Sequence, residues 1–109
     1  MKLPTEIFGN VIVVHTPEEL SADTAGQLET FLTNLDRSQV VIDLNGSETI
    51  ESGGLEAGLG AQETLRALGG DVKISTSNHS NRKILEMTRL EEQLEVFESV
   101  IDAVKSFAG

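Results

Sequence analysis

The stretch from Val40 to Gly60 constrains the fold of this chain more than any other part of the sequence. It begins with the run Val40-Val41-Ile42, which is short and β-branched, as in a strand that is buried on both faces. A polar turn follows, and Leu55, Leu59 and Leu65 then recur at helical spacing. A strand, a loop of small residues and a helix start, in that order, present free backbone N–H groups. That loop is therefore the candidate functional surface.

Charge and composition exclude several classes of function. The 109 residues include 8 Lys or Arg and 18 Asp or Glu, which gives a formal net charge of −10. Nucleic acids and anionic membranes are both recognised by clustered basic residues, which this chain lacks. The absence of cysteine excludes disulfides and thiol catalysis, and no apolar run approaches the ~20 residues of a membrane span. We expect one domain, residues 1–109, that binds no nucleic acid and does not insert into membranes.

The N-terminal residues Met1 to Pro4 lack the apolar region of a signal peptide, so we expect a cytoplasmic protein.

Strand-like and helix-like segments alternate, which predicts an α/β fold with a largely parallel sheet. We expect strands at residues 5–8, 11–15, 40–44, 72–76 and 94–97. The first two flank Gly9-Asn10, which suits a tight hairpin and makes the sheet mixed. Residues 16–20 read as a loop. Helices are expected at 25–35, from about Gly54 to Leu68, after an Asn81 cap, and after a Ser99 cap with Asp102 reaching back.

The start of the first helix has three competing caps. Ser21, Asp23 and Thr24 are all residue types that accept a bond from a free helix amide. Thr24 with Gln27 also matches a capping box.

Residue patterns give little support for catalysis or metal binding. Ser52 lies where a nucleophile elbow would place its serine, but that motif needs a glycine where the chain has Ile50. The only candidate bases are His15 and His79, and nothing in the sequence places either beside Ser52. No glycine-rich phosphate-binding motif is present, and two isolated histidines give no metal-ligand spacing. We expect no enzymatic activity, no cofactor and no metal.

Asp43 lies late in a central strand, where response-regulator receivers carry their phosphoacceptor. Receivers also need an acidic pair at the end of an early strand, and here that strand ends Val14-His15-Thr16. We therefore expect Asp43 to bond backbone groups of the loop near the strand end, since buried polar groups are paired.

Three segments, in order, resemble the STAS domain family, which includes bacterial anti-sigma factor antagonists and cytoplasmic domains of sulfate transporters. They read VVIDLNGSETIESGGLEAGLG, LRALGGDVKI and NRKILEMTRLEEQLEVFES, and the resemblance covers about residues 7–107. It implies a STAS-like mixed sheet of four to five strands, with about four helices packed largely on one side.

In antagonists of this family, a loop of the form Asp-Ser-Ser/Thr-Gly-Leu precedes the second helix. A partner anti-sigma kinase phosphorylates the second hydroxyl, and phosphorylation abolishes partner binding. Aligned on Gly54 and Leu55, this chain has Glu51 at the Asp position, Ser52 at the first hydroxyl and Gly53 at the phosphoacceptor position. The resemblance therefore implies that the usual phosphoacceptor is absent. Ser52 is an alternative acceptor, because the helix dipole would favour a phosphate there.

A second departure lies before the first helix, where the family's Glu-Leu-Asp reads Glu19-Leu20-Ser21. In the family, that Asp helps the kinase reaction and the partner contact. The resemblance still implies a non-enzymatic regulatory module that binds an anti-sigma factor or a GHKL-type kinase. The implied partner-binding residues are Ser21, Asp23, Thr24, Glu51, Ser52, Gly53, Gly54 and Leu55.

In this interpretation Gly53 and Gly54 permit close approach of the partner, so Gly53→Asp should disrupt binding while leaving the fold intact. Two other functions stay open. One is an accessory subunit that docks on the ATPase of a lipid ABC transporter, and the other is a sensor of a small ligand or nucleotide. The sequence leaves the oligomeric state open.

Overall fold

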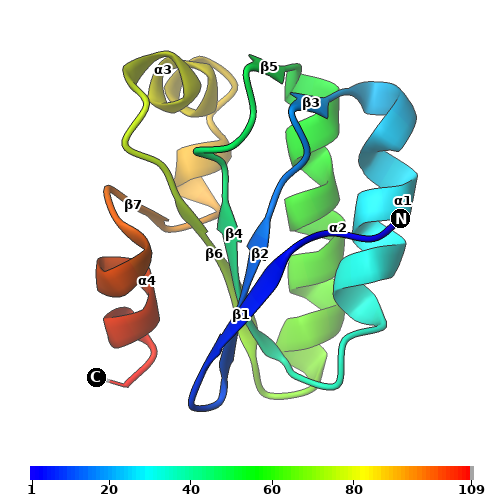
Figure 1. Ribbon diagram of the computed structural model, residues 1–109, viewed down its shortest axis with the longest axis vertical. Coiled ribbons are helices and arrows are strands. Elements are labelled where there is room, and N and C mark those ends of the chain that lie inside the picture. Colours follow the sequence, from blue (N-terminus) through cyan, green and yellow to red (C-terminus); the bar gives the residue numbers. More distant parts are fainter. Residues whose placement is uncertain (109) are drawn as a thin grey trace.

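The computed structural model describes residues 1–108 and contains the α/β fold that the sequence predicts. Its main sheet has five strands in the order β1-β2-β4-β6-β7. The strands are β1 (Thr5–Phe8), β2 (Val11–His15), β4 (Gln39–Asp43), β6 (Asp71–Ser75) and β7 (Val96–Phe97). β1 runs antiparallel to β2 as the predicted hairpin, and all other neighbours are parallel (Figure 1).

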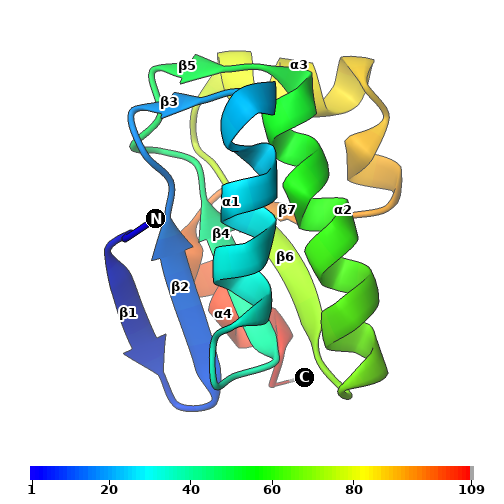
Figure 2. The same cartoon turned by 90° about the vertical axis from the view of Figure 1, so that its right-hand side faces the viewer.

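Four α-helices lie within the described residues, together with one 3-10 turn at Leu90–Glu92. They are α1 (Ala22–Thr33), α2 (Ser52–Ala67), α3 (His79–Met87) and α4 (Val100–Ser106). Figures 1 and 2 show α1 and α2 side by side on one face of the sheet and α4 on the opposite face. The predicted arrangement, with helices largely on one side, is confirmed, and α4 is the exception.

The central strands are covered on both faces, which explains their continuous apolar runs. Successive residues of a strand point to opposite faces, so each strand contributes to two clusters. Ile12 and Ile42 join the larger cluster with α1 and α2, whereas Val13 and Val41 pack with Ala103 of α4. The chain has no Trp or Tyr, so aliphatic packing makes up most of this core.

One charged side chain lies within the smaller cluster. The amine of Lys73, on β6, donates to Ser106 Oγ at 2.8 Å and lies 3.6 Å from Glu95 Oε1. It also lies 4.3 Å from the ring centroid of Phe107 and 5.7 Å from that of Phe97. Because buried charges require such partners, these contacts join α4 to the sheet.

Two helices start at other residues than the sequence predicts. α2 begins at Ser52 rather than Gly54. The N-cap of α3 is Asn78, whose side chain accepts from two helix amides, and not Asn81, which is buried and donates to the carbonyl of Leu44. Asn81 therefore joins α3 to the end of β4 instead of capping the start of the helix.

The caps and faces of α1 and α4 also differ in part from the predictions. The N-cap of α1 is Ser21, and its N–H donates to Thr24 Oγ1 at 3.1 Å, so Gln27 is not the partner in the capping box. The Ser99 cap of α4 is confirmed, because its hydroxyl accepts from the N–H of Asp102 at 3.1 Å. Ile101 of α4 is exposed although its side chain is apolar.

Two short strands were not predicted. β3 (Glu19–Leu20) and β5 (Thr49–Ile50) pair in parallel, apart from the main sheet. β3 falls in the segment expected to be a loop, because two residues are too few to show a periodicity. The pairing brings the start of α1 next to the start of α2.

Two leucines near the end of α2 test this description of the core. Leu65 is 1% exposed and Leu68 is 68% exposed. Leu65→Ala should lower the free energy of unfolding by about 2–5 kcal/mol, because it removes buried methyl groups and leaves a cavity. Leu68→Ala, the matched control, should change it by less than about 0.5 kcal/mol. Urea denaturation of both variants measures the difference, and equal effects would contradict the assigned packing.

Candidate functional site

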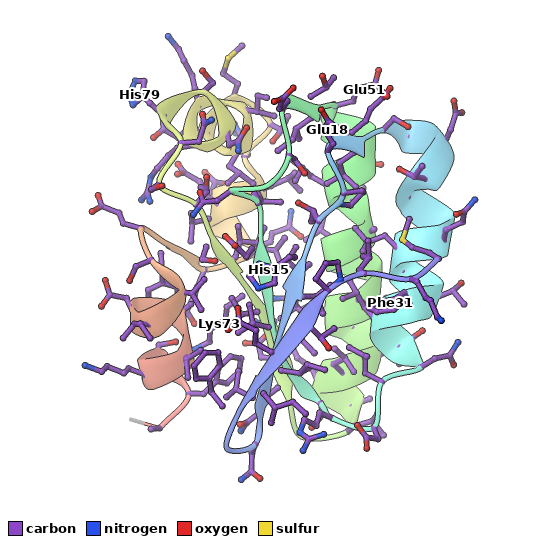
Figure 3. The ribbon with its side chains drawn as sticks, in the orientation of Figure 1. His15, Glu18, Phe31, Glu51, Lys73 and His79 are labelled. Atoms are coloured by element: carbon purple, nitrogen blue, oxygen red, sulfur yellow. The ribbon has the colours of Figure 1, made fainter. Side chains whose placement is uncertain are left out.

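The starts of α1 and α2 are joined through Glu51 and the β3–β5 pair. The N–H of Glu51 donates to the carbonyl of Leu20 at 2.9 Å, and its carboxylate accepts from the N–H of Ala22 at 3.2 Å. At the other end of the β3–β5 pair, the carbonyl of Glu18 accepts from the N–H groups of Glu48 and Thr49. The Glu51 carboxylate therefore lies at the starts of two helices, where the helix dipole favours negative charge. Figure 3 shows Glu18 and Glu51 at this end of the molecule.

Gly53 and Gly54 are needed for this helix contact. A Cβ at Gly53 would lie 2.8 Å from the Cβ of Ala22, and one at Gly54 would lie 2.9 Å from Cγ of Leu20. These distances are shorter than carbon–carbon packing allows. Gly53 thus admits the start of the chain's own first helix, and Gly54 admits Leu20 of β3. For the same reason Gly53→Asp should strain the helix contact in addition to any effect on binding.

The predicted site residues divide by exposure. Leu55 belongs to the main core and Gly54 is buried, so these two support the site from inside. Ser21, Thr24 and Gly53 are half-buried. Asp23, Glu51 and Ser52 are exposed.

Four further acidic residues are exposed beside them, and no motif in the sequence marks them as part of a site. We call the combined set the helix-start surface: Glu18, Glu19, Asp23, Glu48, Glu51, Ser52 and Glu56. No Lys or Arg occurs between Lys2 and Arg37 or between Arg37 and Arg66. The surface is therefore strongly negative.

A shallow groove runs from this surface between the two helices. Its volume is about 380 Å³, and it is lined by Ala22, Ala25, Gly26, Glu29, Gly53, Glu56 and Ala57. The small residues keep its floor low, and the two glutamates add negative charge to its walls. A side chain of a binding partner would fit between the helices here.

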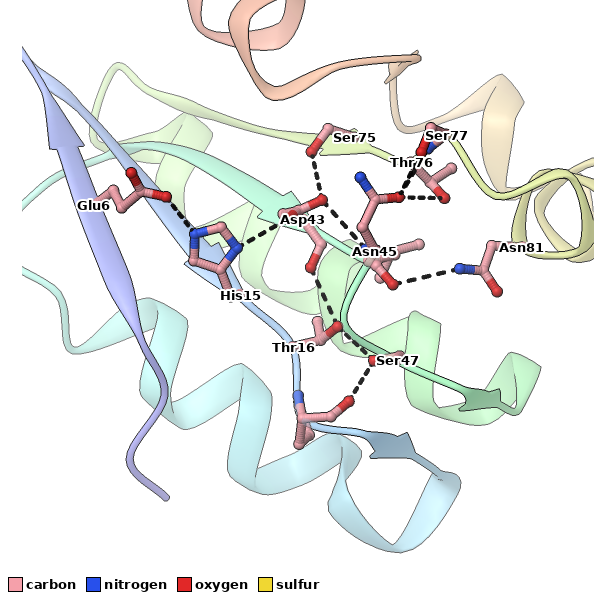
Figure 4. Close-up of polar contacts among 12 residues, drawn as sticks. Glu6, His15, Thr16, Asp43, Asn45, Ser47, Ser75, Thr76, Ser77 and Asn81 are labelled. Carbon is pink, nitrogen blue, oxygen red and sulfur yellow. Dashed lines mark hydrogen bonds and ion pairs between the residues drawn. The ribbon is translucent and has the colours of Figure 1, made fainter.

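Buried hydrogen bonds hold the loops beneath the helix-start surface. The N–H and the hydroxyl of Thr16 both donate to the carbonyl of Asp43, at 3.1 and 3.2 Å. The Ser47 hydroxyl donates to the carbonyl of Pro17, and its oxygen lies within hydrogen-bond distance of the Thr16 hydroxyl oxygen (Figure 4). These bonds join the loop before β3 to the loop before β5, so the surface has a fixed base.

The Asp43 side chain is fully engaged. Its Oδ1 accepts from the N–H of Asn45 and from Ser75 Oγ, both at 3.2 Å, and its Oδ2 lies 2.8 Å from His15 Nδ1. The predicted bond from Asp43 to loop backbone is confirmed by the Asn45 contact. Burial and these partners leave the carboxylate closed to an incoming phosphoryl group.

The structure brings no catalytic base to Ser52. In Figure 3, His15 lies along the sheet, well away from Glu51, and His79 lies on α3. Within residues 1–108, no group of three or more His, Cys, Asp or Glu side chains is placed to hold a metal ion. No helix in that range is long and apolar enough to cross a membrane.

The chain was also compared with known proteins. The family described as the STAS domain matches residues 2–103. No curated protein matches the sequence significantly.

Solved structures agree with this family and, at these identities, show the fold alone. An anti-sigma factor antagonist from Mycobacterium paratuberculosis is 22% identical, with a TM-score of 0.85 over 99% of this chain and 94% of the other. A sulfate transporter family protein from Wolinella succinogenes is 16% identical, with a TM-score of 0.76 over 93% and 87%. The phosphorylated Bacillus cell fate determinant SpoIIAA is 14% identical, with a TM-score of 0.68 over 97% and 99%.

The contact between Gly53 and Ala22 can be tested by a double-mutant cycle. Gly53→Ala should lower the free energy of unfolding by about 1–3 kcal/mol, because its methyl group overpacks the contact. Ala22→Gly should restore part of that loss, with a coupling energy of about 0.5–3 kcal/mol. Chemical denaturation of both single variants and the double variant measures this energy.

Gly26→Ala is the matched control, since a Cβ there meets nothing within 4 Å. It should stabilise α1 by up to about 1 kcal/mol through helix propensity. A coupling energy of zero between positions 22 and 53 would contradict the helix contact.

Proposed function

Because the chain belongs to the STAS domain family, we propose that it is a non-enzymatic regulatory module that binds another protein, as anti-sigma factor antagonists do. The proposed partner is an anti-sigma factor or a related GHKL-type kinase, and the contact is the helix-start surface. The observation that carries the proposal is the joining of the two helix starts on a hydrogen-bonded base. A rigid, exposed surface loses little entropy when it binds.

Charge supports a partner with basic residues at its contact surface. The helix-start surface has six exposed carboxylates, those of Glu18, Glu19, Asp23, Glu48, Glu51 and Glu56. Opposite charge on the partner would speed association and select against acidic competitors. Since such steering is screened by salt, affinity should fall as ionic strength rises.

Gly53 supports binding without phosphorylation at the usual family position. Glycine offers no hydroxyl, and its contact with Ala22 leaves little room for a larger side chain. Ser52 is exposed at the first position of α2, so it remains a candidate acceptor. A phosphate there would add nearly two negative charges to an already acidic surface and so would alter partner binding.

The negative charge of the helix-start surface argues against the other open function, a sensor of a small ligand or nucleotide. No side chain caps the start of α2, so its first amides could in principle bind an anion. The surrounding carboxylates would repel a nucleotide or another anion from that position. Docking on a transporter ATPase would use the same surface, so the binding experiment includes that partner.

The experiment compares two charge reversals on one helix. Glu56 and Glu63 are both exposed on α2 and lie seven residues apart, on nearly the same side of the helix. Glu56→Lys should weaken partner binding at least about tenfold, which is roughly 1.4 kcal/mol. Glu63→Lys should change it less than about twofold, because it lies outside the surface.

Titration calorimetry with the purified GHKL-type anti-sigma protein, and separately with the transporter ATPase, measures both variants. Binding of the ATPase alone would replace the antagonist assignment with the accessory-subunit function. If Glu56→Lys and Glu63→Lys bind the partner with equal affinity, the helix-start surface is not the contact.

A further inference from the structure

A row of polar side chains crosses the main sheet where its parallel strands end. Glu6 on β1, His15 on β2, Asp43 on β4 and Ser75 on β6 come from four adjacent strands. His15 Nε2 lies 2.6 Å from Glu6 Oε1, and His15 Nδ1 lies 2.8 Å from Asp43 Oδ2. Ser75 Oγ donates to Asp43 Oδ1 at 3.2 Å, which completes the row (Figure 4).

The strand register fixes this row. His15 is opposite Asp43, and Asp43 is opposite Ser75, in the parallel ladders. Glu6 is opposite Val13, one pleat away on the same side of the hairpin. Val13 packs with α4, so the row lies on the α4 side of the sheet.

The geometry at His15 requires a protonated ring. Each ring nitrogen lies within hydrogen-bond distance of a carboxylate oxygen. A neutral imidazole has one N–H and can donate to only one of them, whereas an imidazolium donates to both.

The two bonds are not equally sheltered. The side chain of Asp43 is 9% exposed and that of Glu6 is 55% exposed, while His15 is 27% exposed. When one proton leaves the ring, the remaining N–H is held by the more buried carboxylate, since an unpaired buried charge is costly. The bond from His15 to Glu6 is then the one that is lost.

Charged groups around the ring act in the same direction. Partial burial lowers the pKa of His15, but hydrogen bonds and charge from Glu6 and Asp43 outweigh it, so the pKa is raised above 6.5. Among the described residues, those two carboxylates are the only charges that alter this pKa. Lys73 lies on the same side of β6, but its amine contacts Ser106, Glu95 and two phenylalanine rings. Asp102 and Lys105 of α4 are exposed.

β1 depends on this bond more than any other strand of the main sheet. It is an edge strand with one neighbour, and Thr5, Glu6 and Ile7 are exposed. Phe8, at the end of β1, packs against the smaller cluster. Apart from that packing and its ladder with β2, the hairpin arm is held by the bond from the His15 N–H to the carbonyl of Pro4 and by the Glu6–His15 contact.

We propose that Glu6, His15 and Asp43 form a proton-controlled latch on β1. The imidazolium of His15 holds the edge strand to the sheet, and loss of its proton releases Glu6 and loosens β1. The paired strands β2, β4 and β6 stay in place. The latch acts on the fold alone, so it stands whether or not the proposed partner is correct.

The direction of the pH effect follows from the raised pKa of His15. A raised folded-state pKa stabilises the structure fully below the unfolded value of 6.5. The contribution is lost as the pH rises through the folded-state value. β1 should therefore loosen above pH 6.5. Its opening equilibrium should change by up to about tenfold for each pH unit between the pKa of His15 with β1 open and its pKa with β1 closed.

Hydrogen-exchange NMR between about pH 6 and about pH 9 tests the latch. Protection factors, corrected for the intrinsic pH dependence of exchange, should fall for the amides of β1 but not for those of β4. In the same samples the ring signals of His15 should titrate above 6.5. A His79→Gln variant identifies those signals by removing the only other histidine.

Glu6→Gln is the decisive variant, because its exposed side chain keeps its size while losing its charge. The pKa of His15 should fall, and the protection of β1 should no longer depend on pH, since an amide pairs with either form of the ring. Unchanged pH dependence in this variant would overturn the latch. So would a His15 titration at or below 6.5 in the unsubstituted protein.

Discussion

Gly53 lies so close to Ala22 that even a methyl group at position 53 would clash, and the arrangement of the site depends on that contact. Because the helix starts touch, the carboxylate of Glu51 reaches the first amide of α1. The short β3–β5 pair runs into the same place and aligns the two loops. The acidic residues of both loops are thereby collected on one surface, although they are far apart in the sequence.

Much of the fold could be predicted from the sequence, because its main elements are periodic. The run at Val40 indicates a strand covered on both faces, and the hairpin at Gly9 follows from turn chemistry. The β3–β5 pair could not be predicted, since two residues carry no period and their partners are 30 positions apart, as for Glu19 and Thr49. Nor could the role of Gly53, because a glycine that admits a partner and one that admits the chain's own helix look alike in a sequence.

Asp43 contacts both the loops beneath the helix-start surface and the His15 side chain of the proposed latch. Its carbonyl accepts from Thr16 and so supports the loops under the helix-start surface. Its carboxylate accepts from the ring of His15, on the side of the sheet covered by α4. A bond from Asp43 to loop backbone could be expected because buried polar groups are paired, whereas the row through Glu6 and His15 required the strand register. Asp43 thus contributes to both regions, through its backbone carbonyl at the base of the site and through its carboxylate at the edge of the sheet.

Hydrogen exchange by mass spectrometry, with and without the purified partner, shows which residues the partner covers. If the helix-start surface is the contact, partner binding should slow exchange in residues 18–25 and 48–57, which form β3, β5 and the starts of α1 and α2. Segments of α3 and α4 should exchange as before, because they lie outside the surface. Protection confined to α3 and α4, or no protection when the partner is bound, would contradict the account.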